Sequence, residues 1–198
     1  MNSLKLVAIG ILVVAVDLNL GSFDLLFDPV GYLLVVLGLS RVADVHPWFG
    51  HARWAAVVGL LASIAGAVLR RTETFTQGAG SVTSTTTTVV ENPFTSSVES
   101  IAQMVVAFGI CTALIALSRE QRVVGPARTL RWALPGVTLL GWLLSIAVTQ
   151  LDGATIEDNA MAFASLVGAI AIVLVIVTLV LAIWFLIVLF RASREPIP

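Results

Sequence analysis

Charged residues, cysteine and histidine are all scarce in this sequence. Asp, Glu, Lys and Arg make up 12% of the 198 residues, whereas soluble proteins contain roughly a quarter. Hydrophobic residues make up 58%, and the mean hydropathy is +1.01. This composition predicts an integral membrane protein. The single cysteine, Cys111, excludes a disulfide bond within the chain and a zinc site built from several thiolates.

The sequence also lacks the motifs of familiar membrane-enzyme chemistry. It contains no HExxH, no GxSxG, no P-loop and no pair of aspartates inside an apolar segment. His46 and His51 lie around a proline without regular ligand spacing, so they do not predict a metal site. We therefore expect a protein that is not an enzyme and holds no cofactor or metal. The polar residues deep in the apolar segments are few: Gln103, Thr112, Ser145 and Thr178.

Apolar segments that approach the length of a membrane span recur along the chain. About 20 apolar residues are needed to cross a hydrocarbon core of roughly 30 Å. The expected fold class is an all-α integral membrane protein, a single polytopic domain over 1–198 whose six transmembrane helices form three hairpins. The first segment imitates a secretory signal but lacks a cleavage site, so we expect it to be retained. The expected spans are 4–20, 29–45, 53–71, 98–118, 130–150 and 160–190.

Positive charge is distributed unequally between the two sides of these spans. If the spans alternate, all but two of the 11 Lys and Arg residues fall on one side, and Arg70 and Arg71 fall on the other. Because cytoplasmic loops carry the excess of Lys and Arg, both termini are expected in the cytoplasm, with the protein in a bacterial cytoplasmic membrane. Tryptophans that would act as interfacial anchors lie near the same boundary: Trp48, Trp54, Trp132 and Trp184.

Two stretches near the cytoplasmic side align without a gap. Residues 39–54 (LSRVADVHPWFGHARW) and 117–132 (LSREQRVVGPARTLRW) share an initial Leu-Ser-Arg and a final Arg-Trp. Duplication of a helical hairpin would explain the match. Selection for positive charge inside and for interfacial tryptophan would also explain it, so both explanations stay open. The same selection accounts for the basic patch formed by residues 127–132 (ARTLRW) with Arg119 and Arg122, which could touch anionic lipid headgroups.

A Thr-rich insertion, residues 71–95, separates the third and fourth expected spans. Alternating threonines, a Gly-Ala-Gly-Ser turn and a Thr/Val run that ends at Val90 predict an extracytoplasmic β-hairpin. A flexible Ser/Thr-rich stalk is the alternative. Because an isolated two-stranded hairpin is marginally stable in water, we expect it to contact a partner. The expected contact residues are Thr74, Phe75, Thr85, Thr87 and Val89.

Three aspartates, Asp17, Asp24 and Asp28, surround the loop between the first two expected spans. Asp28 precedes a proline, a favoured way to begin a helix, and a short helical turn would place Asp24 and Asp28 on one face. Asp17 lies at the end of an apolar segment, where it needs a counter-charge or water. One hypothesis is an ion pair with Arg70 or Arg71. The other is a cation or proton site formed by the three aspartates.

Small residues recur at the four-residue interval that lets transmembrane helices approach closely. This spacing predicts tight helix contacts. The expected packing positions are Gly59, Ser63, Gly66, Gly109, Ala113, Gly141, Ser145, Ala164 and Gly168.

Residues 17–39, DLNLGSFDLLFDPVGYLLVVLGL, contain an acid, then F-D-x-L-x-D-x-x-G, then an apolar span. This stretch resembles the N-terminal signature of small uncharacterised bacterial multi-spanning membrane proteins. Those proteins tend to have proline where Phe27 stands. The resemblance implies a bacterial inner-membrane location and a helical hairpin, and it implies no activity.

Two functions of different class fit these features. The first is a non-catalytic accessory or scaffold protein, which contacts the lipid bilayer and either a membrane-protein partner or a second copy of itself. The second is a small cation or small-molecule transporter or channel with an acidic outer mouth. We favour the first, because a substrate path is normally lined by polar groups and these are sparse here. Nucleic-acid binding is not expected, since no soluble basic domain is present.

Overall fold

The structure is a computed structural model, and it describes residues 3–15, 19–20, 23–24, 28–69, 71–79, 82–90, 93–151 and 160–194. Within these ranges, the side chains of residues 15, 19–20, 23–24, 71–79, 82–90, 145–151 and 160–165 are not described. The described part contains α-helices and two small antiparallel sheets. The helices are α1 (Ser3–Ala15), α2 (Asp28–Ser40), α3 (Pro47–Leu69), α4 (Pro93–Leu117), α5 (Gln121–Leu151) and α6 (Ala160–Ala192).

The helices differ in their ability to cross a membrane. By length and apolar composition, three segments among the described residues can do so: α3, α4 and Leu166–Ala192 of α6. Helices α1 and α2 are apolar but contain 13 residues each, which corresponds to about 20 Å at 1.5 Å per residue. They are therefore shorter than a hydrocarbon core of roughly 30 Å. The molecule is an α-helical protein with the character of a membrane protein.

Proline marks the start of three helices. Pro47 and Pro93 are the first residues of α3 and α4, and the predicted start of α2 at the Asp28–Pro29 pair is confirmed. Proline suits this position because the first turn of a helix does not use its amide hydrogens. Helix α5 begins at Gln121, well before the apolar segment that the sequence predicted at 130–150. Its first turns are charged, so hydropathy did not include them.

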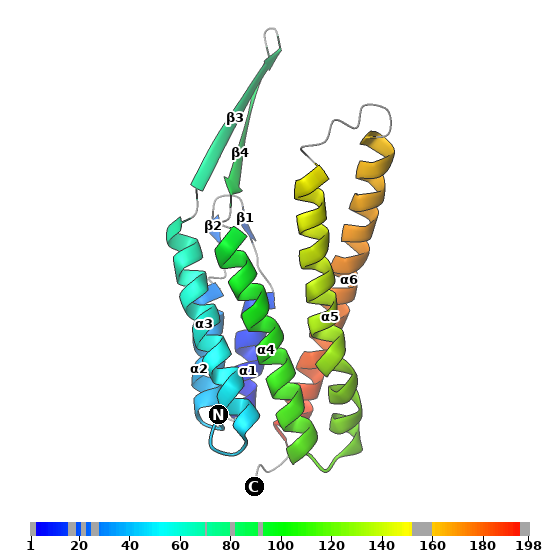
Figure 1. Cartoon of the computed structure of the whole chain (residues 1–198). Helices are drawn as coiled ribbons and strands as arrows, with labels where there is room; N and C mark the ends of the chain where they lie inside the picture. Colours follow the sequence, from blue (N-terminus) through cyan, green and yellow to red (C-terminus); the bar gives the residue numbers. More distant parts are fainter. Residues whose placement is uncertain are drawn as a thin grey trace.

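The longer sheet joins α3 to α4. Strands β3 (Arg71–Ala79) and β4 (Val82–Val90) pair antiparallel, with Arg71 opposite Val90 and Ala79 opposite Val82. The two strands pack mainly on each other, and Figure 1 shows them projecting beyond the ends of the helices.

The predicted helical turn that would place Asp24 and Asp28 on one face is wrong. Asp24 belongs to the two-residue strand β2 (Phe23–Asp24), which pairs with β1 (Asn19–Leu20). Asn19 lies opposite Asp24, and Leu20 lies opposite Phe23. The two residues between the strands in the sequence are Gly-Ser, a dipeptide typical of tight β-hairpins. This local preference favours strand pairing over a helical turn.

The six helices form a closed ring. Each helix contacts the next one along the chain, and α6 contacts α1. Figure 1 shows both chain ends at the same end of the bundle. The starts of α1, α3 and α5 and the ends of α2, α4 and α6 meet there. We call it the arginine end, because eight arginines and one lysine lie in or next to these helix ends. It carries Lys5, Arg41, Arg53, Arg119, Arg122, Arg128, Arg131, Arg191 and Arg194.

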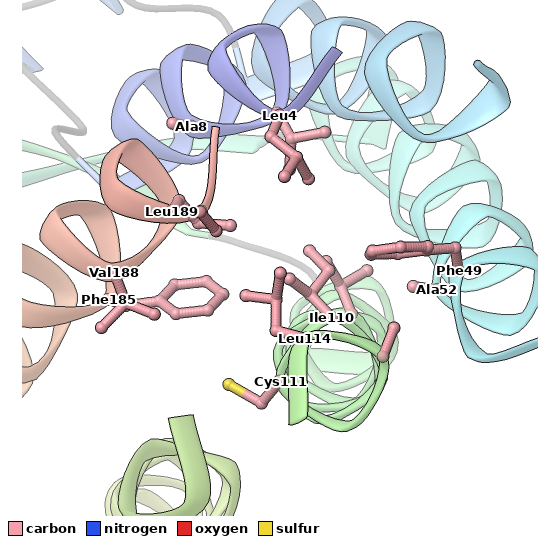
Figure 2. Close-up of a cluster of buried hydrophobic side chains, with 14 of the residues drawn as sticks. Leu4, Ala8, Phe49, Ala52, Ile110, Cys111, Leu114, Phe185, Val188 and Leu189 are labelled. Carbon is pink, nitrogen blue, oxygen red and sulfur yellow. The ribbon is translucent and has the colours of Figure 1, made fainter. Parts of the chain in front are cut away.

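The hydrophobic core is concentrated towards the arginine end. Figure 2 shows Leu4 of α1, Phe49 of α3, Ile110 of α4 and Phe185 of α6 directed towards a common centre. The buried core side chains come from all six helices, and their close packing fixes how the helices lie against one another. Farther from this end, Trp142 of α5 donates a hydrogen bond from Nε1 to Ser97 Oγ of α4, at 3.1 Å.

Helices α1 and α2 approach each other closely through glycine. A Cβ atom added at Gly31 would lie 2.9 Å from the carbonyl oxygen of Gly10, and one added at Gly38 would lie 2.9 Å from the carbonyl oxygen of Ser3. These distances are too short for a side chain, so the two backbones can meet only because both positions are glycine. The sequence prediction of packing residues omitted Gly10, Gly31 and Gly38.

Candidate functional site

Polar residues on three neighbouring helices are brought together away from the arginine end. They follow helical spacing, with Asp28 and Tyr32 four residues apart on α2, and Thr95, Glu99 and Gln103 four residues apart on α4. Such spacing places residues on one face of a helix. Helix α3, which contacts both α2 and α4, contributes Ser63. We call the set Asp28, Tyr32, Ser63, Thr95, Glu99 and Gln103 the Tyr32 cluster.

Tyr32 is the most enclosed member of this cluster. Its side chain is 3% exposed, and its ring lies where a Cβ atom of Gly59 would otherwise be, with Cζ 2.8 Å from that position. The carboxylates of Glu99 and Asp28 act electrostatically on its hydroxyl group, which the Gln103 side chain approaches. The geometry of a hydrogen bond is nevertheless not met, and the hydroxyl group has no partner among the described residues.

Ser63 and Thr95 extend the cluster between α3 and α4. Both side chains are buried, with 5% and 7% of their surface exposed. A Cβ atom at Gly66 would lie 3.3 Å from Thr95 Oγ1 and 3.8 Å from Glu99 Oε1. Gly59 and Gly66 thus leave room on α3 for the polar side chains of its neighbours. The predicted packing residues Gly59 and Gly66 face this cluster, and Ser63 lies on the same side of α3 by its spacing.

The Tyr32 cluster presents oxygen atoms of several chemical kinds, namely carboxylate, phenol, amide and hydroxyl. These groups can hold helices together by hydrogen bonds, and they can also accept a proton or a hydrated cation. Among the described residues, no group of three His, Cys, Asp or Glu side chains could hold a metal ion. His46 accepts a hydrogen bond from the Trp48 amide, and His51 Nδ1 lies 2.8 Å from the Pro47 carbonyl oxygen. Each histidine therefore has a backbone partner.

The predicted acidic mouth is only partly described. Asp17 and Arg70 lie outside the described residues, so the proposed ion pair between them stays a prediction. Asp24 and Arg71 are described by their backbone positions in β2 and β3. Asp28 belongs to the Tyr32 cluster, whose other acidic member is Glu99 of α4. No single signal in the sequence linked Asp28 with Glu99, which are far apart along the chain.

The predicted partner-contact residues occupy β3 and β4. The register places Thr74 opposite Thr87, and Phe75 opposite Thr86. Thr85, Thr87 and Val89 occupy alternate positions along β4. Their side chains are not described, so their contacts stay a prediction.

The remaining predicted packing residues divide into two groups. Gly109 lies against α3, since an added Cβ atom would be 3.0 Å from the Trp48 carbonyl oxygen, and Ala113 is buried. By contrast, a Cβ atom added at Gly141 or at Gly168 would meet nothing within 4 Å. The side chains of Ser145 and Ala164 are not described.

Sequence reasoning missed Tyr32 as the centre of the cluster. The four-residue spacing of Asp28 and Tyr32 and of Glu99 and Gln103 could have indicated it. The placement of α2 and α4 on either side of α3, by contrast, is a tertiary property. No known protein family, curated protein or solved structure matches the chain.

Proposed function

We propose that the protein is a non-catalytic accessory or scaffold protein of the bacterial cytoplasmic membrane, which associates with a partner membrane protein or complex. In this proposal all six helices lie across the membrane, the arginine end faces the cytoplasm, and the β3–β4 hairpin lies outside. The single-sided distribution of Lys and Arg supports this orientation. The resemblance of residues 17–39 to small bacterial membrane proteins is consistent with the location.

The observation that carries the proposal is the open surface of α5 and α6. From Leu166 to Val180, every residue of α6 is exposed except Val167 and Leu174, which are half-buried. These two residues are seven apart and therefore lie on one narrow strip of the helix surface. Gly141 and Gly168 lie next to open space. Small residues on a membrane helix allow another helix to approach its backbone. The glycines of α1 to α3 are used inside the chain, whereas these two remain open to a partner helix.

The β3–β4 hairpin provides a second surface for the same partner. Its strands pack mainly on each other, and a two-stranded hairpin alone is marginally stable in water. A partner that covers one face of the hairpin would supply the missing packing. Thr74, Phe75, Thr85, Thr87 and Val89 are the contact residues of this proposal.

Affinity capture tests the proposal. The full-length protein with a C-terminal tag is extracted from native membranes in a mild detergent, and the stoichiometrically bound proteins are identified by mass spectrometry. We expect a constant membrane-protein partner. Gly141→Leu and Gly168→Leu should remove it without unfolding the chain, because a Cβ atom at either position has no neighbour within 4 Å among the described residues. Gly125→Leu is the matched control, since Gly125 of α5 also has nothing within 4 Å but lies near the arginine end.

Two results would overturn the proposal. One is recovery of the wild-type protein as a monomer or a homo-oligomer, with no other protein bound in stoichiometric amount. The other is a constant partner whose recovery is the same for Gly141→Leu, Gly168→Leu and Gly125→Leu, because the open glycines would then have no part in the association.

The Tyr32 cluster favours a second candidate function, a small cation transporter or channel. Two carboxylates act electrostatically on a buried phenol that has no hydrogen-bond partner among the described residues, and polar groups in such places commonly lie on ion pathways. Under this candidate, Asp28→Asn should abolish cation flux into proteoliposomes, as should Asp17→Asn and Asp24→Asn at the proposed mouth. Asp44→Asn, in the loop between α2 and α3 at the arginine end, is the control and should leave flux unchanged. Absence of flux in the wild-type protein would exclude this candidate.

A further inference from the structure

Three aromatic side chains from three consecutive helices form a ladder near the arginine end. The ring of Phe108 on α4 lies 5.5 Å from that of Trp48 on α3 and 5.3 Å from that of Trp132 on α5, measured between centroids. Both pairs meet edge to face, at 67° and 72°, an arrangement that aromatic quadrupoles favour. Trp48 is 37% exposed and Trp132 is 63% exposed. The ladder therefore forms part of the outer surface of the bundle.

Arg131 lies on this ladder. Its Cζ atom is 5.1 Å from the centroid of Phe108 and 5.0 Å from that of Trp132, so the guanidinium group is held by two cation–π contacts. Its Nε atom is buried and has no hydrogen-bond partner, and no carboxylate pairs with the group among the described residues. The side chain as a whole is only half-buried. A positive charge is thus held at a half-buried position with no carboxylate partner among the described residues.

The corresponding arginine of the aligned stretch differs. Arg53 and Trp54 match Arg131 and Trp132, and Arg53 also lies over its tryptophan, with 5.5 Å from Cζ to the centroid. Among the described contacts, Arg53 has a single cation–π partner, whereas Arg131 has two on different helices. The general preference for Arg and Trp at a membrane interface accounts for Arg53–Trp54 and for Arg131–Trp132. It does not account for the contact of Arg131 with Phe108 of the neighbouring helix α4.

The surroundings of Arg131 indicate the chemistry of a ligand. Exposed Arg128 lies one helical turn before it, which adds a second positive charge to the same side of α5. Along α5, away from the arginine end, the exposed Leu139 and Leu143 follow Trp132 by 7 and 11 residues and therefore lie on the same face of the helix. A ligand that fits both regions has an anionic group beside the guanidinium and an apolar chain along α5. A planar guanidinium group binds phosphate through two parallel hydrogen bonds.

We propose that Trp48, Phe108, Arg131 and Trp132 form a binding site for the headgroup of an anionic phospholipid. The phosphate accepts hydrogen bonds from the guanidinium group of the half-buried Arg131, the tryptophans lie at the headgroup level, and the acyl chains follow the apolar surface of α5. Basic sites between membrane helices commonly bind anionic headgroups in this way. The inference concerns lipid and holds whether or not the chain binds a partner protein.

Lipid binding to the purified, delipidated full-length protein tests the site. Binding of phosphatidylglycerol and of phosphatidylcholine is measured by native mass spectrometry in the same detergent. We expect phosphatidylglycerol to bind at least tenfold more tightly. Arg131→Gln should reduce its affinity about tenfold, which corresponds to about 1.4 kcal/mol, and leave phosphatidylcholine unchanged. Arg191→Gln, at an exposed arginine of the same end that lacks an aromatic partner among the described contacts, should change neither.

Other arms of the experiment separate this site from simpler explanations. Arg131→Lys keeps the charge but loses the planar group, so we expect an intermediate affinity; this variant also decides the question if Arg131→Gln does not fold. Equal affinity of the wild-type protein for the two lipids would overturn the proposal, as would equal losses in Arg131→Gln and Arg191→Gln. Displacement of phosphatidylglycerol by inorganic phosphate would show that the site binds a free anion, and would overturn the assignment to lipid.

Discussion

At the level of single residues, the glycines of this protein divide by what lies beside them. Gly10, Gly31 and Gly38 lie against the backbone of a neighbouring helix, and Gly59 lies under the ring of Tyr32. Gly125, Gly141 and Gly168 have open space in the position of a side chain. The same residue type therefore supports close internal packing in α1 to α3 and leaves an uncovered surface in α5 and α6.

Gly31→Ala should destabilise the protein, because its Cβ atom would lie 2.9 Å from the Gly10 carbonyl oxygen and 3.0 Å from the Val14 amide nitrogen. Both atoms belong to the backbone and cannot rotate away. Overpacking of this kind costs about 1–3 kcal/mol. The thermal unfolding midpoint in detergent measures the effect. Gly168→Ala is the control and should be neutral or stabilising by up to about 1 kcal/mol, since alanine favours helix. Equal midpoints for the two variants would contradict the α1–α2 packing.

Tyr32→Phe should preserve or increase stability. The hydroxyl group is buried without a hydrogen-bond partner among the described residues, and such burial costs about 1–3 kcal/mol. Removal of the oxygen relieves this cost while the ring still packs on Gly59. Tyr32→Ala should lose about 3–5 kcal/mol, as expected for deletion of a buried aromatic ring. Unfolding of both variants is followed by the same thermal measurement. A clear loss of stability in Tyr32→Phe would show that the hydroxyl group has a partner.

At the level of elements, the first two helices are much shorter than the last two. Helices α1 and α2 have 13 residues each, whereas α5 has 31 and α6 has 33. The short pair is held by glycine contacts and by the core near the arginine end. The long pair extends beyond that core, so most of α6 from Leu166 to Val180 has no neighbour within the described chain apart from α5.

Replacement of residues 72–90 by a short Gly-Ser linker should leave the helix bundle intact. Strands β3 and β4 pack mainly on each other, and α3 and α4 contact each other along their own length. We expect the thermal midpoint to change by no more than a few degrees, while recovery of the proposed partner falls at least severalfold. Circular dichroism and affinity capture measure the two effects. Collapse of the bundle would show that the strands stabilise α3 and α4, and unchanged capture would show that the partner does not bind the hairpin.

At the level of the whole molecule, the ring of helices sets which residues share an end. Both chain ends and the arginine-rich turns lie together, and the β3–β4 hairpin projects from the opposite end (Figure 1). A membrane protein with this arrangement has one strongly basic face. The positive-inside rule predicts that this face lies in the cytoplasm, which is the orientation proposed above.

Cysteine labelling tests this orientation. Cys111 is fully buried, so the wild-type protein should not react with a membrane-impermeant maleimide. We expect Thr85→Cys to react in intact cells, and Arg194→Cys to react only after the membrane is permeabilised. Reaction is followed by the mass shift of the tagged protein in a denaturing gel. The reverse pattern would place the arginine end outside.

The sequence predicted local features better than it predicted contacts. Apolar segments and the Asp28–Pro29 pair located the helices, because hydropathy and proline chemistry act over a few residues. The start of α5 was missed because its first turns are charged, and the turn around Asp24 was missed because strand pairing outweighed a helical interpretation. Among the candidate site residues, Asp28 was expected, but its association with Tyr32, Glu99 and Gln103 requires α2, α3 and α4 to be side by side.

The sequence by itself determined the helical character of the protein, the approximate position of each helix and the concentration of positive charge at alternate turns. These properties depend on the composition and the residue spacing of each short segment, and not on how the segments pack together. The tertiary structure alone decided the close approach of α1 and α2 at glycine, the enclosure of Tyr32 and the position of Arg131 over Phe108. Each of these requires atoms from helices far apart in the sequence to meet, and that meeting depends on how the whole ring packs.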